Sequence, residues 1–232
     1  MSLADELRDY AKKTHGTTWT RRDGQKVPST DDITLGNSAV DLNAVVLYAD
    51  LKDSTGLVKG EPDWFASEVY KNYLYTVSRI IRAHNGTITA FDGDRVMGVF
   101  IGGSKNSNAA KVALKINWAV KKILQPAMQE KYPENTYTLQ QKVGIASSKT
   151  MVSRTGIRGS NDLVWVGNAA NIAAKLAALH TGYSSYITAD VYAKLSEETK
   201  LGGTPKRDMW TDLGVTDGFG RIYGSTFWWS IS

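Results

Sequence analysis

The sequence predicts an α+β fold in which helices pack on one mixed, mostly antiparallel sheet. Two kinds of segment follow one another along the chain: strand-like runs of apolar and β-branched residues, and stretches with apolar residues at helical spacing. Strands and helices intermingle, which is typical of a sheet covered by helices. The chain has 232 residues, of which 42% are hydrophobic, so it is long enough for one large domain with an extension.

The first half of the chain has the order β-α-β-β-α-β, which is the ferredoxin-like signature. We expect a short helix at 3–13, a loop at 14–38, a strand at 44–49, a helix at 64–84 that Asn85-Gly86 ends, a hairpin at 87–100, a helix at 109–125 and a strand at 137–147. Residues 1–42 are polar and are assigned to an N-terminal extension, and residues 43–232 to one folded domain.

The second half alternates shorter elements. We expect a Gly-rich turn region at 153–162, strands at 163–166 and 186–188, helices at 168–179 and 189–195, a loop at 202–206 and a terminal strand at 224–231. We interpret Trp228 and Trp229 as core residues of that terminal strand. The alternative interpretation is that they lie in a subunit interface. His84 and His180 lie at predicted helix ends, where we interpret them as caps.

The composition argues against several classes of site. The chain has no cysteine, so disulfides and thiolate metal sites are excluded, and its three histidines are few for a zinc site. No apolar run approaches the ~20 residues that span a bilayer, and the N-terminus lacks the apolar core of a signal peptide. We therefore expect a cytoplasmic protein without a membrane partner. The net charge of +5 favours anionic ligands but is too small to indicate nucleic-acid binding.

Carboxylates gather where strand-like runs end. Asp50 ends the run NAVVLYAD, and Asp53 follows three residues later. In TITAFDGDRVMGVF, two strand-like runs flank the tight-turn signal Asp92-Gly93-Asp94. If the two strands are neighbours, the carboxylates of Asp50 and Asp94 converge on one point, where they repel each other unless a cation lies between them. Oxygen ligands of this kind suit Mg²⁺ or Mn²⁺.

A third motif lies at 162–176, where the sequence reads DLVWVGNAANIAAKL. A short strand runs into Gly167, and a helix follows. Asn171 and Lys175 are four residues apart, so they lie on one face of this helix. Read alone, the stretch also fits an ordinary alanine-rich helix with exposed polar residues.

Together, the three motifs resemble the catalytic domain of the class III nucleotidyl cyclases, the adenylate and guanylate cyclases. Residues 48–51 (YADL) with Ser54-Thr55 resemble the first metal motif of that family, and Gly93-Asp94 resembles the second. Residues 167–176 resemble its helix motif, Gly-x-x-x-Asn-x-x-x-Arg-Leu. The resemblance covers roughly residues 41–188, and it implies the class III cyclase fold for the domain at 43–232.

The resemblance also implies a reaction and its cofactors. In this family the 3′-oxygen of a nucleotide attacks its own α-phosphorus and expels pyrophosphate, so the enzyme mainly positions the groups and stabilises charge. Two divalent metal ions, Mn²⁺ or Mg²⁺, would bind Asp50, Asp94 and the backbone carbonyl of Leu51. A homodimer is implied as well, because the active sites of the family are shared between two subunits.

The remaining roles follow from the same resemblance. Asn171 would orient the ribose, and Lys175 would stabilise charge on the α-phosphate. The terminal phosphates would bind the backbone amides from Asp53 to Gly56, a segment that includes Ser54 and Thr55 and can form an anion-binding nest.

Five positions depart from the family pattern. Lys175 stands where an arginine is usual, which keeps the charge but loses the bidentate fork. Ala90 and Val164 occupy the positions that read a purine base, and neither side chain can form a hydrogen bond with a base edge. Tyr48 replaces a phenylalanine and would shrink the pocket toward a smaller base. Arg95 directly follows the second metal aspartate, where it could donate to a base carbonyl, to a phosphate or to a neighbouring aspartate.

These departures resemble one branch of the family, the pyrimidine cyclases of the bacterial anti-phage Pycsar system, which make cyclic UMP or cyclic CMP. We interpret the chain as an enzyme for a nucleoside triphosphate, with UTP favoured, and a phage-derived component would activate it. A cytidylate cyclase, an adenylate or guanylate cyclase, and a degenerate nucleotide-binding regulatory domain remain as alternatives, although the last would predict loss of a metal aspartate. A polymerase-like palm shares the two carboxylates, but the chain is short for a polymerase.

Overall fold

The computed structural model of the chain describes residues 1–179 and 181–231, so the cap predicted at His180 lies outside the described residues. The chain divides into two compact units. The first consists of Met1–Asn43 and Lys149–Gly167, and the second of Ala44–Ser148 and Asn168–Ser232. Strands β2 (Ser38–Leu51) and β5 (Gln141–Ile157) contribute residues to both units. The predicted division into an extension at 1–42 and a domain at 43–232 stays a prediction.

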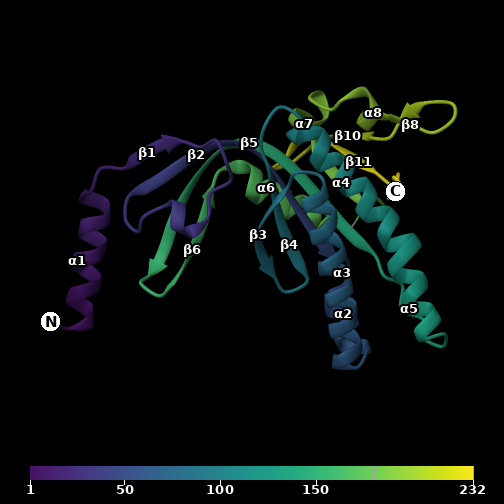
Figure 1. Cartoon of the computed structure of the whole chain (residues 1–232), viewed down its shortest axis with the longest axis horizontal. Helices are drawn as coiled ribbons and strands as arrows, with labels where there is room; N and C mark the ends of the chain where they lie inside the picture. The colour runs from purple at the N-terminus through teal and green to yellow at the C-terminus, as the bar shows by residue number, and fades with distance from the viewer. Residues whose placement is uncertain (180, 232) are drawn as a thin grey trace. The chain divides into compact units, whose positions relative to one another are not determined.

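The second unit is a sheet with helices packed on it (Figure 1). Its helices are α2 (Ser54–Gly60), α3 (Asp63–Ala83), α4 (Lys105–Ala119), α5 (Gln125–Lys131), α6 (Asn168–Ala177), α7 (Ala189–Ala193) and α8 (Glu197–Lys200), with a π-helical turn at Val120–Leu124. Besides parts of β2 and β5, its strands are β3 (Thr87–Asp92), β4 (Arg95–Phe100), β7 (Ser185–Thr188), β10 (Thr211–Thr216) and β11 (Gly220–Ser225), and β8 (Leu201–Gly202) pairs separately with β9 (Arg207–Asp208).

The strand order of this sheet is β10-β11-β7-β5-β2-β4-β3. The pairs β2–β4, β3–β4, β7–β11 and β10–β11 are antiparallel, whereas β5 and β7 are parallel. The predicted mixed, mostly antiparallel sheet is therefore confirmed. None of the helices in the described part of the chain is long and apolar enough to cross a membrane.

Helix α3 forms where the apolar spacing predicts it, within one residue at each end. Its apolar stripe, which includes Phe65, Val69 and Val77, is buried in the main core. Asn85 ends the helix with a positive φ of 61°, a conformation that asparagine tolerates better than most residues. Helix α3 packs beside α4 over the sheet, as Figure 1 shows. The helices thus position the loops that leave the ends of β2 and β3.

The two faces of the sheet carry different helices. Along β7, Ile187 belongs to the core that α3 and α4 cover, and its neighbour Tyr186 packs with Leu176 of α6. Successive strand residues point to opposite faces, so α6 lies on the face opposite α3 and α4.

Gly144 of β5 lets α6 approach the sheet closely. A Cβ atom at this position would lie 2.1 Å from the backbone oxygen of Ala173 and 2.6 Å from the backbone nitrogen of Ala177. We therefore expect Gly144→Ala to lower the free energy of unfolding by about 1–3 kcal/mol, because neither helix backbone atom can move aside cheaply. Denaturant unfolding measures this change. Gly60→Ala is the matched control, since a Cβ there meets nothing within 4 Å; equal losses in both variants would contradict the close packing.

The first unit contains an N-terminal helix, α1 (Leu3–Gly16), strand β1 (Thr20–Asp23) and a 3₁₀ turn at Thr30–Asp32. Strand β1 pairs in parallel with the start of β2, and β6 (Ser160–Val166) pairs antiparallel with the end of β5. The predicted helix at 3–13 is confirmed and is longer, whereas the loop predicted at 14–38 contains strand β1.

Two predicted segments are wrong. Residues 153–162 form strands β5 and β6 and not a turn region, because the glycines serve a hairpin: Gly156 and Gly159 have positive φ values of 106° and 85°, and Ile157 pairs with Ser160. Residues 226–231 form no strand. This tail lies along α4, where the Asn117 side-chain amide donates to the carbonyls of Thr226 (3.0 Å) and Phe227 (2.8 Å).

The tail also changes the interpretation of its tryptophans. Trp229 is partly buried against the main core, and its backbone N–H donates to the carbonyl of Leu114 at 3.1 Å. Trp228 is 48% exposed, with the Lys122 ammonium 5.1 Å from its ring centroid. Only part of the predicted core role is therefore correct, and an interface role for the two rings stays a prediction.

Candidate active site

Asp50 lies near the carboxyl end of β2, buried beside a cation from the neighbouring strand. Its Oδ2 accepts a hydrogen bond from Nη2 of Arg95 at 2.9 Å. Strands β2 and β4 are antiparallel neighbours, with Ala49 opposite Val96, so this register brings Asp50 close to the start of β4. The sequence left three partners open for Arg95, and in this structure Arg95 pairs with the neighbouring aspartate.

Asp94 is held beside this pair by the β3–β4 hairpin. Asp92 pairs with Arg95, so the loop between the strands consists of Gly93 and Asp94. Gly93 has a φ of 60°, which the first loop residue of a type II′ turn requires and glycine supplies without strain. The Asp94 Oδ2 atom is buried and has no hydrogen-bond partner among the described residues. A buried carboxylate oxygen without a partner is costly, so this position favours a cation.

The electrostatics of Asp50 agree with that conclusion. Burial raises the pKa of Asp50 above its ordinary value, and the nearby Asp94 carboxylate raises it further, whereas the positive charge of Arg95 lowers it. Arg95 therefore does not fully offset the two carboxylates. Among the described residues, no group of three or more His, Cys, Asp or Glu side chains is arranged to hold a metal ion. The candidate donors for a cation here are the two carboxylates and the carbonyl of the buried Leu51, which directly follows Asp50 in the sequence.

Three tyrosines that the sequence analysis did not assign to the site lie near enough to the carboxylates for the carboxylate charges to affect their pKa values. Tyr73 of α3 is fully buried and its hydroxyl has no partner among the described residues; burial raises its pKa well above the ordinary value, and the charges of Asp50 and Asp94 add to this. Burial and then Asp94 raise the pKa of Tyr70 as well. Tyr70 and Tyr73 are three residues apart on the buried side of α3, and this spacing was the available signal.

Tyr137 is the third. Burial is the main cause that raises its pKa to about 12, with Tyr70, Asp53, Asp94 and Glu61 adding to the shift. Its hydroxyl is buried and has no partner among the residues that the structure describes. The sequence predicted only the start of a strand here, and β5 begins later, at Gln141.

The raised pKa of Tyr137 predicts a loss of stability at alkaline pH. Because the folded pKa of about 12 lies above the ordinary value of 10.0, the folded state holds the phenol proton more tightly than the unfolded state. Its contribution to stability is complete below pH 10 and is lost as the pH rises toward 12. We expect Tyr137→Phe to lose less stability than the wild type between these values, measured by denaturant unfolding at pH 8 and at about pH 11. Tyr75→Phe, at an exposed tyrosine, is the control; identical pH profiles for Tyr137→Phe and the wild type would contradict the assignment.

The predicted phosphate segment is the turn that starts α2. Asp53 has a left-handed backbone, with φ 59°, and its side chain caps the helix: Oδ1 accepts from the Gly56 backbone N–H at 3.1 Å. The carboxylate thus occupies one of the amides that the sequence analysis assigned to phosphate. Ser54 and Thr55 lie in the first turn of α2, and Ser54 influences the pKa of Tyr70, so this turn adjoins the carboxylates.

The predicted base positions on β2 and β3 share one row of the sheet. Tyr48 and Ala90 each pair with Met97 of the strand between them, so their side chains lie on the same face. Asp50 and Arg95 are two residues from Tyr48 and Met97 and therefore share this face. Burial is the main cause that raises the pKa of Tyr48. The positive charge of Arg95 partly offsets this increase, and the negative charge of Asp92 adds to it. Val164 belongs to β6 in the first unit, where it is 41% exposed and pairs with Ser153.

Asn171 and Lys175 lie on the outer side of α6. The other side of this helix, with Ala173 and Leu176, is buried, and both polar side chains are exposed. Among residues 1–179 and 181–231, no recorded hydrogen bond or ion pair engages either side chain. The structure thus brings together Asp50, Asp94 and Arg95, and none of the described contacts joins Asn171 or Lys175 to them. Within this subunit, α6 presents two unengaged polar groups to its surroundings.

Comparison with known proteins shows relatives along the whole chain. The uridylate cyclase of Xanthomonas perforans is 44% identical over 233 residues, which cover 100% of this chain and 100% of that protein. The uridylate cyclase of Burkholderia cepacia is 44% identical over 236 residues, again with 100% of both chains covered. Among solved structures, the adenylyl cyclase CyaB from P. aeruginosa superposes with a TM-score of 0.67 at 21% identity, over 81% of this chain and 95% of that one. No protein-family model matches the sequence.

Proposed function

This chain belongs to the uridylate cyclases and has the class III nucleotidyl cyclase fold, and we propose that it converts UTP to 3′,5′-cyclic UMP and pyrophosphate. The observation that carries the proposal is the pair formed by Asp50 and Asp94, in which one buried carboxylate oxygen has no partner among the described residues. The pair lies near the carboxyl end of β2, and the turn that starts α2 follows this strand. This arrangement suits a phosphate ester neutralised by cations.

The reaction forms one bond and breaks another within a single nucleotide. The ribose 3′-oxygen attacks the α-phosphorus, its proton leaves, and the bond between the α-phosphorus and the bridging oxygen breaks to release pyrophosphate. Nucleophile and electrophile are already joined, so the protein must hold them in line and stabilise the charge that develops on the phosphate oxygens.

Asp50 and Asp94 fit two divalent cations, Mn²⁺ or Mg²⁺, together with the Leu51 carbonyl. These ions prefer hard oxygen donors. The buried Oδ2 atom of Asp94, which has no hydrogen-bond partner among the described residues, supports this assignment. When bound, such ions supply the positive charge that acidifies the 3′-hydroxyl and neutralises phosphate oxygens. Arg95, which now pairs with Asp50, is available to interact with the nucleotide if cations satisfy that carboxylate.

The substrate contacts extend from this centre. Ser54 and Thr55 would hold the terminal phosphates, with Asp53 fixing the turn. Tyr48 and Ala90 would border the base, and the bulk of Tyr48 favours a pyrimidine. Arg95 can donate to a uracil carbonyl, which is an acceptor that cytosine lacks at position 4. By the family resemblance, Val164 would be a further base-contacting residue.

Asn171 and Lys175 would act across a subunit interface. Neither side chain has a hydrogen bond or ion pair to the described residues of its own chain, and a two-fold dimer would supply each of its two sites with the carboxylates of one subunit and the polar pair of the other. Asn171 would orient the ribose, and Lys175 would stabilise charge on the α-phosphate. A cytoplasmic role in anti-phage signalling, triggered by a phage component, completes the proposal and rests on the resemblance to the pyrimidine branch.

A nucleotide panel tests the proposed reaction. The purified chain is incubated separately with UTP, CTP, ATP and GTP and Mn²⁺, and the products are identified by mass spectrometry. We expect cyclic UMP as the main product, with none from Asp94→Asn under the same conditions. Cyclic CMP as the main product would overturn the role of Arg95 in selecting uracil, and a purine product would overturn the pocket built by Tyr48 and Ala90.

A further inference from the structure

Helix α1 has an apolar face that nothing in the first unit covers. All 14 residues of the helix are described, and none is buried. Leu3, Leu7 and Tyr10 are 70%, 59% and 63% exposed. A helix of this length is only marginally stable in water on its own, and apolar side chains gain free energy when they are covered. The helix is therefore expected to be covered by a partner.

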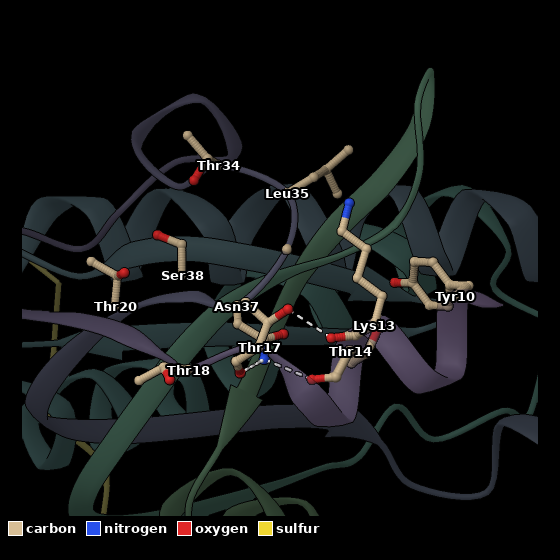
Figure 2. A pocket seen from close by; sticks show the side chains of 11 residues that line it. Tyr10, Lys13, Thr14, Thr17, Thr18, Thr20, Thr34, Leu35, Asn37 and Ser38 are labelled. Carbon is tan, nitrogen blue, oxygen red and sulfur yellow. Dashed lines mark hydrogen bonds between the residues drawn. The ribbon is translucent and has the colours of Figure 1, made fainter.

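Both ends of α1 are fixed, although its face is open. At the start, the side chains of Ser2 and Asp5 form a capping box. At the end, the side-chain amide of Asn37 donates to the carbonyl oxygens of Thr14 at 2.8 Å and Thr17 at 2.6 Å (Figure 2). These contacts satisfy carbonyls that a helix end leaves free. They hold the helix in place without covering its apolar side.

The apolar face has the spacing of a coiled-coil seam. Leu3, Leu7, Tyr10 and Thr14 follow one another at intervals of four, three and four residues. Tyr10 and Thr14 also border a hollow of about 570 Å³ in the first unit, which Leu35 helps to line (Figure 2). The seam thus ends beside a recess of the first unit.

The flanks of the seam identify the partner by their chemistry. On one flank lie two small residues, Ala4 and Ala11, which permit close approach of another helix. On the other flank lie Glu6 and Lys13, seven residues apart and of opposite charge. Such a flank is complementary to the same flank of an antiparallel copy of the helix, in which Glu6 of each helix faces Lys13 of the other.

The overall charge of the helix argues against a lipid surface. The acidic side chains Asp5 and Glu6 lie near its start and the basic side chains Lys12 and Lys13 near its end, with Arg8 and Asp9 between them, so the two signs balance. Helices that lie on anionic membranes carry an excess of lysine and arginine on their polar face. The separation of charge along the axis instead favours a helix that runs in the opposite direction, whose dipole is also opposed.

We propose that α1 pairs antiparallel with α1 of a second copy of this chain. The two-fold axis passes between residues 8 and 9, so that Leu7 packs against the partner's Tyr10 and Leu3 against the partner's Thr14. Glu6 lies beside the partner's Lys13 on each side of the axis, and the alanines face each other. A parallel pair would place Glu6 against the partner's Ala11 and leave these charges unpaired.

Cysteine cross-linking tests the pairing, because the chain has no cysteine of its own. Leu3→Cys is made in one preparation of the full chain and Thr14→Cys in another, and the two are mixed and oxidised gently. The antiparallel pair predicts a mixed cross-linked product at least about tenfold more abundant than either self-linked product. The proposal would be overturned if self-linked Leu3→Cys were the main product. It would also be overturned if the mixed product did not exceed the level seen when Lys12→Cys, on the opposite face of the helix, replaces Thr14→Cys in the mixture.

Charge reversal tests the register independently. Glu6→Lys in both cysteine-bearing chains places like charges beside each other, and we expect about tenfold less mixed product. Glu6→Lys in the Leu3→Cys chain combined with Lys13→Glu in the Thr14→Cys chain restores opposite charges and should restore the product. Lys12→Glu is the matched control for Lys13→Glu, and it should have no effect. Failure of the complementary combination to recover the product would overturn the proposed register.

Discussion

Asp94→Asn is expected to abolish cyclase activity without destabilising the fold. We expect kcat to fall by about 10³-fold or more, which corresponds to about 4 kcal/mol of transition-state stabilisation, because an amide cannot neutralise or bind a cation as a carboxylate does. The same change removes the charge that helps to raise the pKa of Asp50. With one carboxylate fewer in a buried site, the melting temperature should rise by about 2–4 °C, which corresponds to roughly 1 kcal/mol.

The two readouts must come from one preparation. Asp92→Asn is the matched control, since it makes the same substitution at an exposed position on the same hairpin and should change neither rate nor melting temperature appreciably. If Asp94→Asn instead lowered the melting temperature and kept its activity, Asp94 would be a structural turn residue. A higher melting temperature together with a loss of activity would show that the carboxylate pair costs stability and serves the reaction.

The elements with strong local signals could be predicted from the sequence. Helix α3 and the β3–β4 hairpin match their predictions closely, because apolar periodicity and the Asp92-Gly93-Asp94 turn are local properties. The region 153–162 could not be predicted in this way: its glycines resemble a loop, and only the pairing of Ile157 with Ser160 shows that they belong to a hairpin. The prediction of a strand in the C-terminal tail failed for a related reason. The carbonyls of this tail accept hydrogen bonds from Asn117, which lies more than 100 residues earlier in the sequence.

The candidate site divides in the same way. The convergence of Asp50 and Asp94 could be predicted, because each follows from a strand end and an antiparallel pairing. The partner of Arg95 and the hydroxyls of Tyr73 and Tyr137 could not, because they depend on how side chains from separate elements approach one another. Tyr73 lies within the helix predicted at 64–84, and the sequence analysis gave it no role in the site. Helical spacing places Tyr73 on the buried side of α3, but its closeness to Asp50 and Asp94 depends on how α3 and the strand ends pack together.

Lys175→Ala is expected to lose at least about 10²-fold in kcat, because the charge that develops on the α-phosphate would lose its cationic partner. Lys175 is exposed on α6, so the substitution should leave stability nearly unchanged. Lys175→Arg should retain activity or increase it, since arginine adds a second hydrogen bond at the same charge. Lys71→Ala, at an exposed lysine of α3, is the matched control.

A mixture of two inactive variants then tests whether the site is shared. In a dimer that contains one Asp94→Asn subunit and one Lys175→Ala subunit, one site lacks both groups, and the other combines an intact Asp94 with an intact Lys175 from the opposite chain. Random exchange makes half of the dimers mixed, with one working site in two, so about a quarter of the wild-type activity should return. If both groups served the same chain, every site in the mixture would lack one of them and no activity would return. Recovery therefore requires the unengaged face of α6 to act in the site of its partner.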